Sequence, residues 1–200
     1  MRIWSLVVVG TLSLLAAACE KVAPPQPASL EEGNRCFEAG QWSCAGANYN
    51  GYLKTYPDDP IVNARLAMAR TRAGHHKEAI YYYQKAESLG VVTYDLFASY
   101  ALSLDATGDL DGAIRANLKA LEIVPRLVDV RGSLANQLVR KGQTQDAIEL
   151  LEEFDAFLKR QGEDPYFTAQ IASIKEKAGQ KPAESYSRPV NKGGPADRVG

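Results

Sequence analysis

A glycine that recurs every 34 residues constrains this chain more than any other feature of its sequence. Gly40, Gly74, Gly108 and Gly142 are each followed five residues later by an alanine. Equal intervals of this length indicate an array of similar units, each made of two helices and a turn. A glycine at the turn would end the first helix of each pair. We therefore expect about four consecutive helix-turn-helix units.

The residues around each glycine repeat with the same period. Small residues precede it by seven positions and follow it by five, and a larger residue follows the second small one: Gly33, Ala67, Ala101 and Ala135; Ala45, Ala79, Ala113 and Ala147; Tyr49, Tyr83, Asn117 and Leu151. Small side chains let antiparallel helices approach to about 8–10 Å, and stacked pairs bury a core that one pair cannot. Asn117 is polar within this set, which fits either a hydrogen-bonded core amide or a local weak point.

Pro57 and Pro125 close two of the units, and the order of small, aromatic and proline positions resembles the tetratricopeptide repeat (TPR) family over roughly residues 30–161. The resemblance implies an all-α, right-handed TPR solenoid of about four repeats. One more amphipathic helix follows, and Asp164 and Pro165 suit its cap and first turn. We expect this helix to cap the array, and we place the TPR domain at residues 30–178.

The N-terminus predicts export. Arg2 is followed by a mostly apolar run over residues 3–15, three alanines and Cys19. A basic start, an apolar run and small residues form a secretory signal, and the run is shorter than the roughly 20 residues of a membrane span. An ordinary secretory peptide with a chance cysteine remains an alternative at this point.

Cys19, directly after the three alanines, resembles the lipobox cysteine of bacterial lipoproteins. That resemblance implies a signal peptide over residues 1–18, an acylated Cys19 and a periplasm-facing, lipid-anchored protein of the cell envelope. Glu20 stands where inner-membrane lipoproteins often have Asp, which favours the outer membrane.

Residues 19–29 are rich in proline and predict a stiff linker. Residues 179–200 contain few apolar side chains and many Gly, Pro and Ser, so we expect a disordered tail.

Cys36 and Cys44 form an even pair in an oxidising compartment once Cys19 is acylated. They lie late in the first helix and early in the second helix of the first repeat, and such positions face each other across a tight turn. We expect a disulfide, with two reduced, buried thiols as the alternative. Two cysteines without a nearby histidine do not make a zinc site, so we expect no metal.

The sequence gives no support for catalysis or for nucleic-acid binding. The formal net charge is −1, whereas nucleic-acid binding needs a basic surface. The only histidines, His75 and His76, are adjacent in an expected turn, and the aspartates near residue 109 lack the spacing of a calcium loop. Because no hydrolase, zinc-protease or phosphate-loop motif occurs, we predict a protein that is not an enzyme and needs no cofactor.

In the TPR family, the first helix of each pair lines a concave groove that holds a protein or peptide. The family's groove positions, carried over to this chain, give the candidate contact residues Phe37, Ile61, Met68, Arg72, Asp95, Leu102, Asp105, Asn136 and Arg140. The apolar members suit an apolar or amphipathic segment, and the two arginines would select acidic neighbours. Each residue could instead be plain solenoid surface. The Lys and Asn clamp of chaperone-binding TPR proteins is not matched.

The layout of signal, anchor and short TPR array is similar to that of Flp/Tad pilus-assembly lipoproteins and of type IV pilus pilotins. This resemblance implies a non-catalytic scaffold that assists assembly of an envelope or pilus complex. An alternative is an adaptor that recruits peptidoglycan hydrolases or proteases in the periplasm. A third class is a regulatory TPR piece whose catalytic part lies in another chain.

Overall fold

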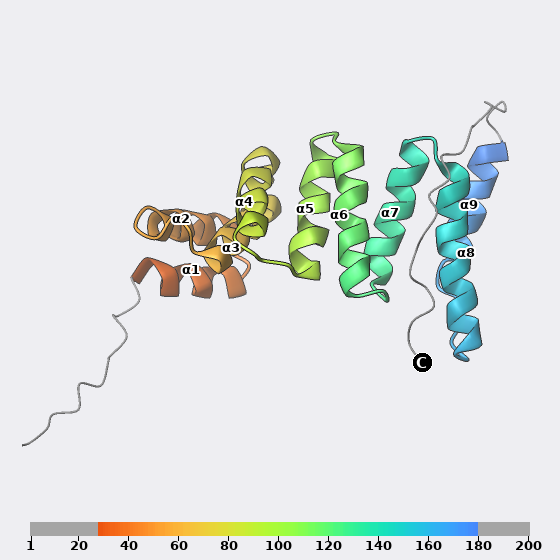
Figure 1. Ribbon diagram of the computed structural model, residues 1–200, viewed down its shortest axis with the longest axis horizontal. Coiled ribbons are helices and arrows are strands. Elements are labelled where there is room, and N and C mark those ends of the chain that lie inside the picture. Colours follow the sequence, from red (N-terminus) through yellow and green to blue (C-terminus); the bar gives the residue numbers. More distant parts are fainter. Residues whose placement is uncertain (1–27, 180–200) are drawn as a thin grey trace, which may run out of the picture.

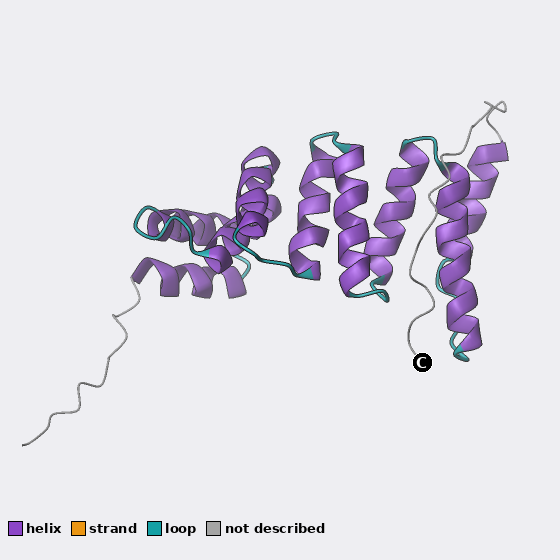
Figure 2. Ribbon diagram, viewed as in Figure 1, coloured by secondary structure: helices purple, strands orange, loops and turns teal. Residues whose placement is uncertain are grey.

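The computed structural model describes residues 28–179, and these residues form nine helices and no strand. The helices are α1 (Ala28–Glu38), α2 (Trp42–Leu53), α3 (Pro60–Arg72), α4 (His76–Ser88), α5 (Tyr94–Ala106), α6 (Leu110–Ile123), α7 (Val128–Arg140), α8 (Thr144–Arg160) and α9 (Thr168–Gly179). They follow one another as four antiparallel pairs, and α9 closes the row (Figures 1 and 2). The predicted all-α TPR solenoid is confirmed.

Several sequence-based predictions fall on residues outside this range. The signal peptide, Cys19 and the tail after Gly179 lie outside the described residues. The linker predicted for residues 19–29 lies there too, except at its end, because α1 already begins at Ala28. No helix in the described part of the chain has the length and apolar character needed to cross a membrane.

The recurring glycines end the first helix of each pair in a left-handed conformation. Their φ angles are +69° at Gly40, +81° at Gly74, +89° at Gly108 and +84° at Gly142. The amide after each glycine donates back to a carbonyl five residues earlier, as His75 N does to Arg70 O at 2.8 Å. A residue with a Cβ is strained at such an angle, so glycine at this position fixes where each pair turns.

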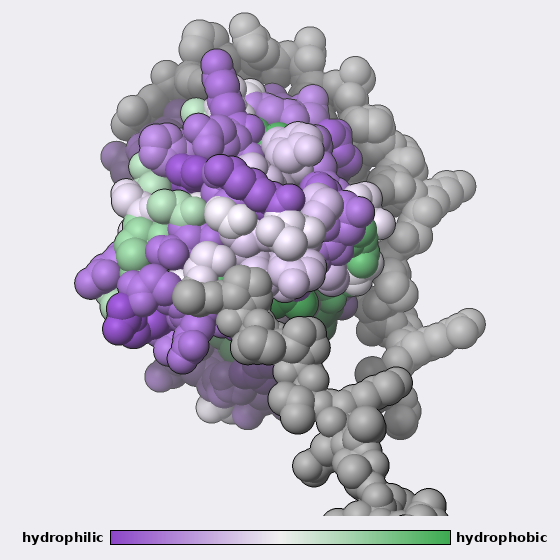
Figure 3. All heavy atoms as spheres, turned by 90° about the vertical axis from the view of Figure 1, so that its left-hand side faces the viewer, coloured by the Kyte–Doolittle hydropathy of each residue, from purple (hydrophilic) through white to green (hydrophobic). Residues whose placement is uncertain are grey.

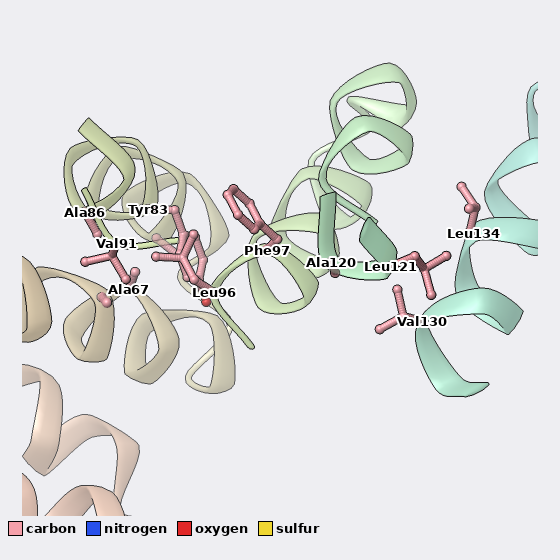
Figure 4. Packing of buried hydrophobic residues seen from close by; sticks show 12 residues of the cluster. Ala67, Tyr83, Ala86, Val91, Leu96, Phe97, Ala120, Leu121, Val130 and Leu134 are labelled. Carbon is pink, nitrogen blue, oxygen red and sulfur yellow. The ribbon is translucent and has the colours of Figure 1, made fainter. Parts of the chain in front are cut away.

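The repeated small and large positions form the core. Ala45, Ala79, Ala113 and Ala147 are fully buried, and Figure 4 shows core side chains following one another from α3 to α7. The buried Asn117 amide donates to Gln137 Oε1 at 2.9 Å, so it is a hydrogen-bonded core amide and not an unsatisfied one. The core therefore runs along the array instead of closing around one centre.

The last helix begins later than the sequence suggested. We expected Asp164 and Pro165 to open it, but α9 starts at Thr168. The buried Asp155 carboxylate, on α8, accepts hydrogen bonds from the backbone amides of Tyr166 at 2.8 Å and Phe167 at 2.9 Å. A side chain from the preceding helix thus caps the start of α9, a role that local sequence preference assigned to Asp164.

Candidate partner-binding groove

The first helices of the four pairs lie in a row and are joined by side-chain contacts. The Arg65 guanidinium on α3 donates to Asn34 Oδ1 on α1, and Thr71 Oγ1 lies 2.7 Å from Ser103 Oγ on α5. We call the exposed surface of α1, α3, α5 and α7 the first-helix face. It contains the residues that the sequence proposed for partner binding.

Two apolar side chains stand open on this face. Ile61 on α3 is 54% exposed and Leu102 on α5 is 50% exposed. Met68 lies on α3 between the core and solvent, because its side chain is partly buried against the central cluster of the core. Ile61 and Leu102 can therefore be covered by a partner without any rearrangement, whereas Met68 contributes to the stability of the array as well.

The charges on the face differ in whether they are already paired. Arg72, at the end of α3, is exposed, and no carboxylate of residues 28–179 lies within 4.0 Å of its guanidinium. Asp95, at the start of α5, is exposed as well, and its hydrogen bond and negative charge raise the pKa of the neighbouring Tyr94. Arg72 thus remains available for an acidic group of a partner.

Arg140 is not free in the same way. Its guanidinium forms an ion pair with the Asp105 carboxylate, which links α7 to α5. Asp105 Oδ2 also accepts a hydrogen bond from the side-chain amide Nε2 of Gln137 at 3.4 Å. The sequence suggested that Arg140 would select an acidic partner, whereas in the structure its charge is already balanced across the repeat boundary.

Two further predicted groove residues are used within the protein. Phe37 packs edge-to-face on Trp42 with ring centroids 5.5 Å apart, and it also contacts Tyr49, so it belongs to the core of the first repeat. Asn136 is exposed, but its Oδ1 accepts a hydrogen bond of 3.0 Å from Gln170 on α9. The open part of the first-helix face is therefore centred on α3 and α5.

A buried polar network, which the sequence analysis missed, holds α3, α4 and α5 together beneath this open part. The hydroxyl of Thr71 lies 2.9 Å from Tyr83 Oη and 2.7 Å from Ser103 Oγ. Burial raises the pKa of Tyr83 to about 12. Because Thr71 and Ser103 directly precede Arg72 and follow Leu102 in the chain, the network fixes the spacing of these two contact residues. The sequence signal that could have revealed this network was the presence of polar residues at positions that are otherwise apolar in the core.

The cysteines of the first repeat form a disulfide that joins α1 to α2. The Cα atoms of Cys36 and Cys44 lie 5.8 Å apart. Glu32 lies beside them, and these three residues are the one group of potential metal ligands of this kind among residues 28–179. Sulfur atoms bonded to each other do not ligate a metal, so the bridge serves as a covalent link within the repeat.

A cleft of about 450 Å³ lies away from the first-helix face, between α4 and α6. Phe97 and Tyr100 of α5 form its apolar floor. An ion pair between Glu87 and Lys119 crosses it, and the Lys119 ammonium lies 5.0 Å from the centroid of the Phe97 ring. Glu87 and Lys119 are therefore already paired with each other.

Comparison with proteins of known structure supports the fold. MamA from Desulfovibrio magneticus matches with a TM-score of 0.58 and 15% identity, over 74% of this chain and 75% of that one. A second MamA crystal structure matches with a TM-score of 0.60 and 16% identity, over 79% of this chain and 96% of the other. These matches define the class of the structure as a TPR array.

A shorter TPR domain is similar to part of the array. The first TPR domain of Spaghetti (RPAP3), solved with an HSP90 peptide of sequence SRMEEVD, matches with a TM-score of 0.53 and 19% identity, over 57% of this chain and 90% of that domain. No protein-family model and no curated protein sequence matches the chain. The similarity is thus one of fold, at identities too low to transfer a function.

Proposed function

We propose that this protein is a lipid-anchored scaffold of the bacterial cell envelope, whose first-helix face holds a segment of a partner protein while an envelope or pilus complex assembles. The TPR fold supports the scaffold, since stacked helical pairs offer an extended binding surface. The lipobox-like sequence before Cys19 supports the anchor. The protein acts by holding its partner, without catalysis and without a cofactor.

The observation that carries this proposal is the open apolar pair on neighbouring helices. Ile61 and Leu102 are half exposed on α3 and α5, and the unpaired Arg72 lies at the end of α3. An amphipathic or extended segment with apolar side chains and a carboxylate would bury the first two and neutralise the third. The peptide bound to the similar RPAP3 domain, SRMEEVD, combines acidic and apolar residues in this way.

The disulfide agrees with a periplasmic location. Bridges such as Cys36–Cys44 persist in oxidising compartments and are rare in the reducing cytosol. Acylation of Cys19 would hold the protein on a bilayer, since one acyl chain binds only marginally while two or more anchor stably. The absence of Asp after Cys19 favours the outer membrane.

Crosslinking in intact cells tests this proposal, followed by separation of the membranes and mass spectrometry of the crosslinked proteins. We compare the native chain with Leu102→Asp and with Leu118→Asp. Leu118, on α6, is a matched control because it is 44% exposed but lies outside the first-helix face. We expect Leu102→Asp to lose the partner at least about tenfold, which corresponds to roughly 1.4 kcal/mol, while Leu118→Asp keeps it.

The identity of the partner separates the candidate functions. Secretin or pilus subunits in the outer-membrane fraction support assembly, and peptidoglycan hydrolases or proteases support the adaptor alternative instead. Equal loss in both leucine variants would show that the first-helix face is not the binding surface. An unacylated chain in the soluble fraction would overturn the lipid anchor.

A further inference from the structure

The two edges of the array differ in their exposed apolar residues. One edge consists of the turns within pairs, at residues 39–41, 73–75, 107–109 and 141–143, and none of the large exposed hydrophobic side chains of the described residues lies there. The other edge consists of the junctions between pairs. Its last three junctions carry Val92, Tyr94, Ile123 and Tyr166, which are 62%, 38%, 40% and 63% exposed. We call these four residues the junction edge.

The junction edge lies on one side of the molecule. In Figure 1 the connections α4–α5, α6–α7 and α8–α9 lie along the lower side, where α1 also lies, and the turns α5–α6 and α7–α8 lie on the opposite side. The α2–α3 junction faces the N-terminal end of the array, where the surface is mostly hydrophilic with separate apolar areas (Figure 3). A flat surface below the array in Figure 1 would meet the three apolar junctions together.

The charges beside these residues are only partly paired, because the exposed carboxylates of Asp95, Glu122, Asp129 and Asp164 form no ion pair with any described residue. Arg126, in the α6–α7 junction, pairs with Glu163, in the α8–α9 junction, at 2.7 Å, and its guanidinium also lies over the Phe157 ring. This ion pair holds two of the junctions side by side. The edge therefore suits a partly apolar, uncharged surface better than a strongly anionic one.

We propose that the junction edge rests on the bilayer to which the acylated Cys19 is attached, so that the array lies along the membrane. This inference depends on the lipid anchor proposed above. Cys19 precedes the first residue of α1 by nine residues, and a proline-rich segment of that length spans about 28 Å. So short a tether keeps the domain at the membrane surface, where weak contacts are enough to set its orientation.

The residue types fit the headgroup region of a membrane. Tyrosine places an apolar ring and a hydroxyl at the boundary between acyl chains and water, and two of the four junction-edge residues are tyrosines. Valine and isoleucine add apolar contact beside them. Because unpaired carboxylates such as Asp95 and Glu122 lie beside these residues, we expect the contact to weaken as the fraction of anionic lipid rises.

Hydrogen exchange on the full acylated chain tests the orientation, in vesicles of phosphatidylethanolamine and phosphatidylglycerol recovered by flotation. We expect amides at residues 90–94, 123–127 and 161–167 to exchange at least about fivefold more slowly on vesicles, with no change at residues 107–109 and 141–143. The double variant Val92→Glu/Tyr166→Glu should still float but lose this protection. The matched double variant His75→Glu/Ala106→Glu, at the turn edge, should keep it.

The possible results separate the orientation from the anchor. A chain that floats and shows equal exchange at both edges overturns the orientation but leaves the anchor intact. A chain without acyl groups that does not float overturns both. Protection of the junctions that appears without vesicles and grows with protein concentration would show that a second copy covers the edge, and would overturn the membrane contact.

Discussion

The two ends of the array solve the same problem by different means. A terminal repeat has no neighbour on one side, so part of its core would face water. At the N-terminal end, the Cys36–Cys44 bridge joins α1 to α2 covalently, and Phe37, Trp42 and Tyr49 pack beside it. At the C-terminal end there is no bridge, and α9 covers the last pair instead.

The cover at the C-terminal end depends on one buried carboxylate and an apolar stripe. Asp155 accepts hydrogen bonds from the two amides directly before α9, while Phe167, Ile171 and Ile174 are buried against the last pair. A terminal pair of short helices can thus be stabilised by a covalent link, whereas a pair with a longer second helix, such as α8, can support an additional helix. The first end should therefore respond to reductants, and the second to substitutions of Asp155.

The largest expected effect comes from Asp155→Ala. The change leaves the buried amide of Phe167 and the partly buried amide of Tyr166 without an acceptor, which we expect to cost about 2–4 kcal/mol. Because contacts in an array are local, α9 should detach while α1–α4 keep their protection in hydrogen exchange. Glu152→Ala is the control, since it removes only an exposed ion pair to Lys175. Equal losses in both variants would mean that the cap is not what holds α9.

Removal of the bridge should have the next largest effect. The double variant Cys36→Ser/Cys44→Ser should lower the free energy of unfolding by about 2–3 kcal/mol, because the unfolded chain is no longer constrained by the closed loop. Urea unfolding of the variant and of the reduced native protein should agree. A native, unreduced protein with two free thiols would refute the bridge.

Gly33 in α1 and Gly132 in α7 show that the two ends of the array differ in how tightly their helices pack. A Cβ at Gly33 would lie 2.8 Å from the Tyr49 ring, whereas a Cβ at Gly132 would meet its nearest neighbours at 3.4 Å. We expect Gly33→Ala to destabilise by about 1–3 kcal/mol through overpacking. Gly132→Ala should be neutral or stabilise by up to about 1 kcal/mol, because alanine is the better helix former. Thermal unfolding of the two variants checks the contrast.

The smallest effect at neutral pH is expected in the middle of the array. Tyr83→Phe removes one hydrogen bond to Thr71, at a cost of about 0.5–1.5 kcal/mol. The folded state raises the pKa of Tyr83 to about 12, above its usual 10, so its neutral form is favoured. The associated stability is complete below pH 10 and is lost as the pH rises from about 10 to 12.

Unfolding measured against pH checks the central network. The native protein should lose more stability between about pH 10 and 12 than Tyr83→Phe does, because the phenylalanine variant cannot ionise at that position. Tyr81→Phe is the matched control, since Tyr81 is 59% exposed on the same helix. If the native protein and Tyr83→Phe had parallel pH profiles, the buried hydroxyl would not be the cause.

Much of the fold could be predicted because it depends on local rules. The glycine period located the turns within pairs, and the helical spacing of Phe167, Ile171 and Ile174 identified the face that α9 buries. The start of α9 was wrong because its cap comes from a distant residue. Arg131 is a second case in which a distant residue matters. It occupies a position where apolar residues are usual, and it fits there because its guanidinium lies over the Phe154 ring of α8, 4.5 Å from the ring centroid.

The candidate site was less predictable than the fold. Of the groove residues taken over from the TPR family, Ile61 and Leu102 are exposed, and their role in partner binding stays a prediction. The sequence could not show that Arg140 is paired with Asp105, or that Phe37 is used by the first repeat. Those facts depend on neighbours from other helices, whose distance and orientation follow from packing.

The number of repeats, the places where the pairs turn and the small residues at which helices meet could all be derived from the amino-acid sequence. This is because a left-handed turn requires a glycine and a close helix contact requires a small residue, each at one fixed position of the repeat. The packed helices were needed to show which charges remain unpaired, which residue caps α9 and which edge carries exposed apolar side chains. These properties depend on contacts between residues of different helices, such as Arg140 and Asp105, and those contacts form only when the pairs stack.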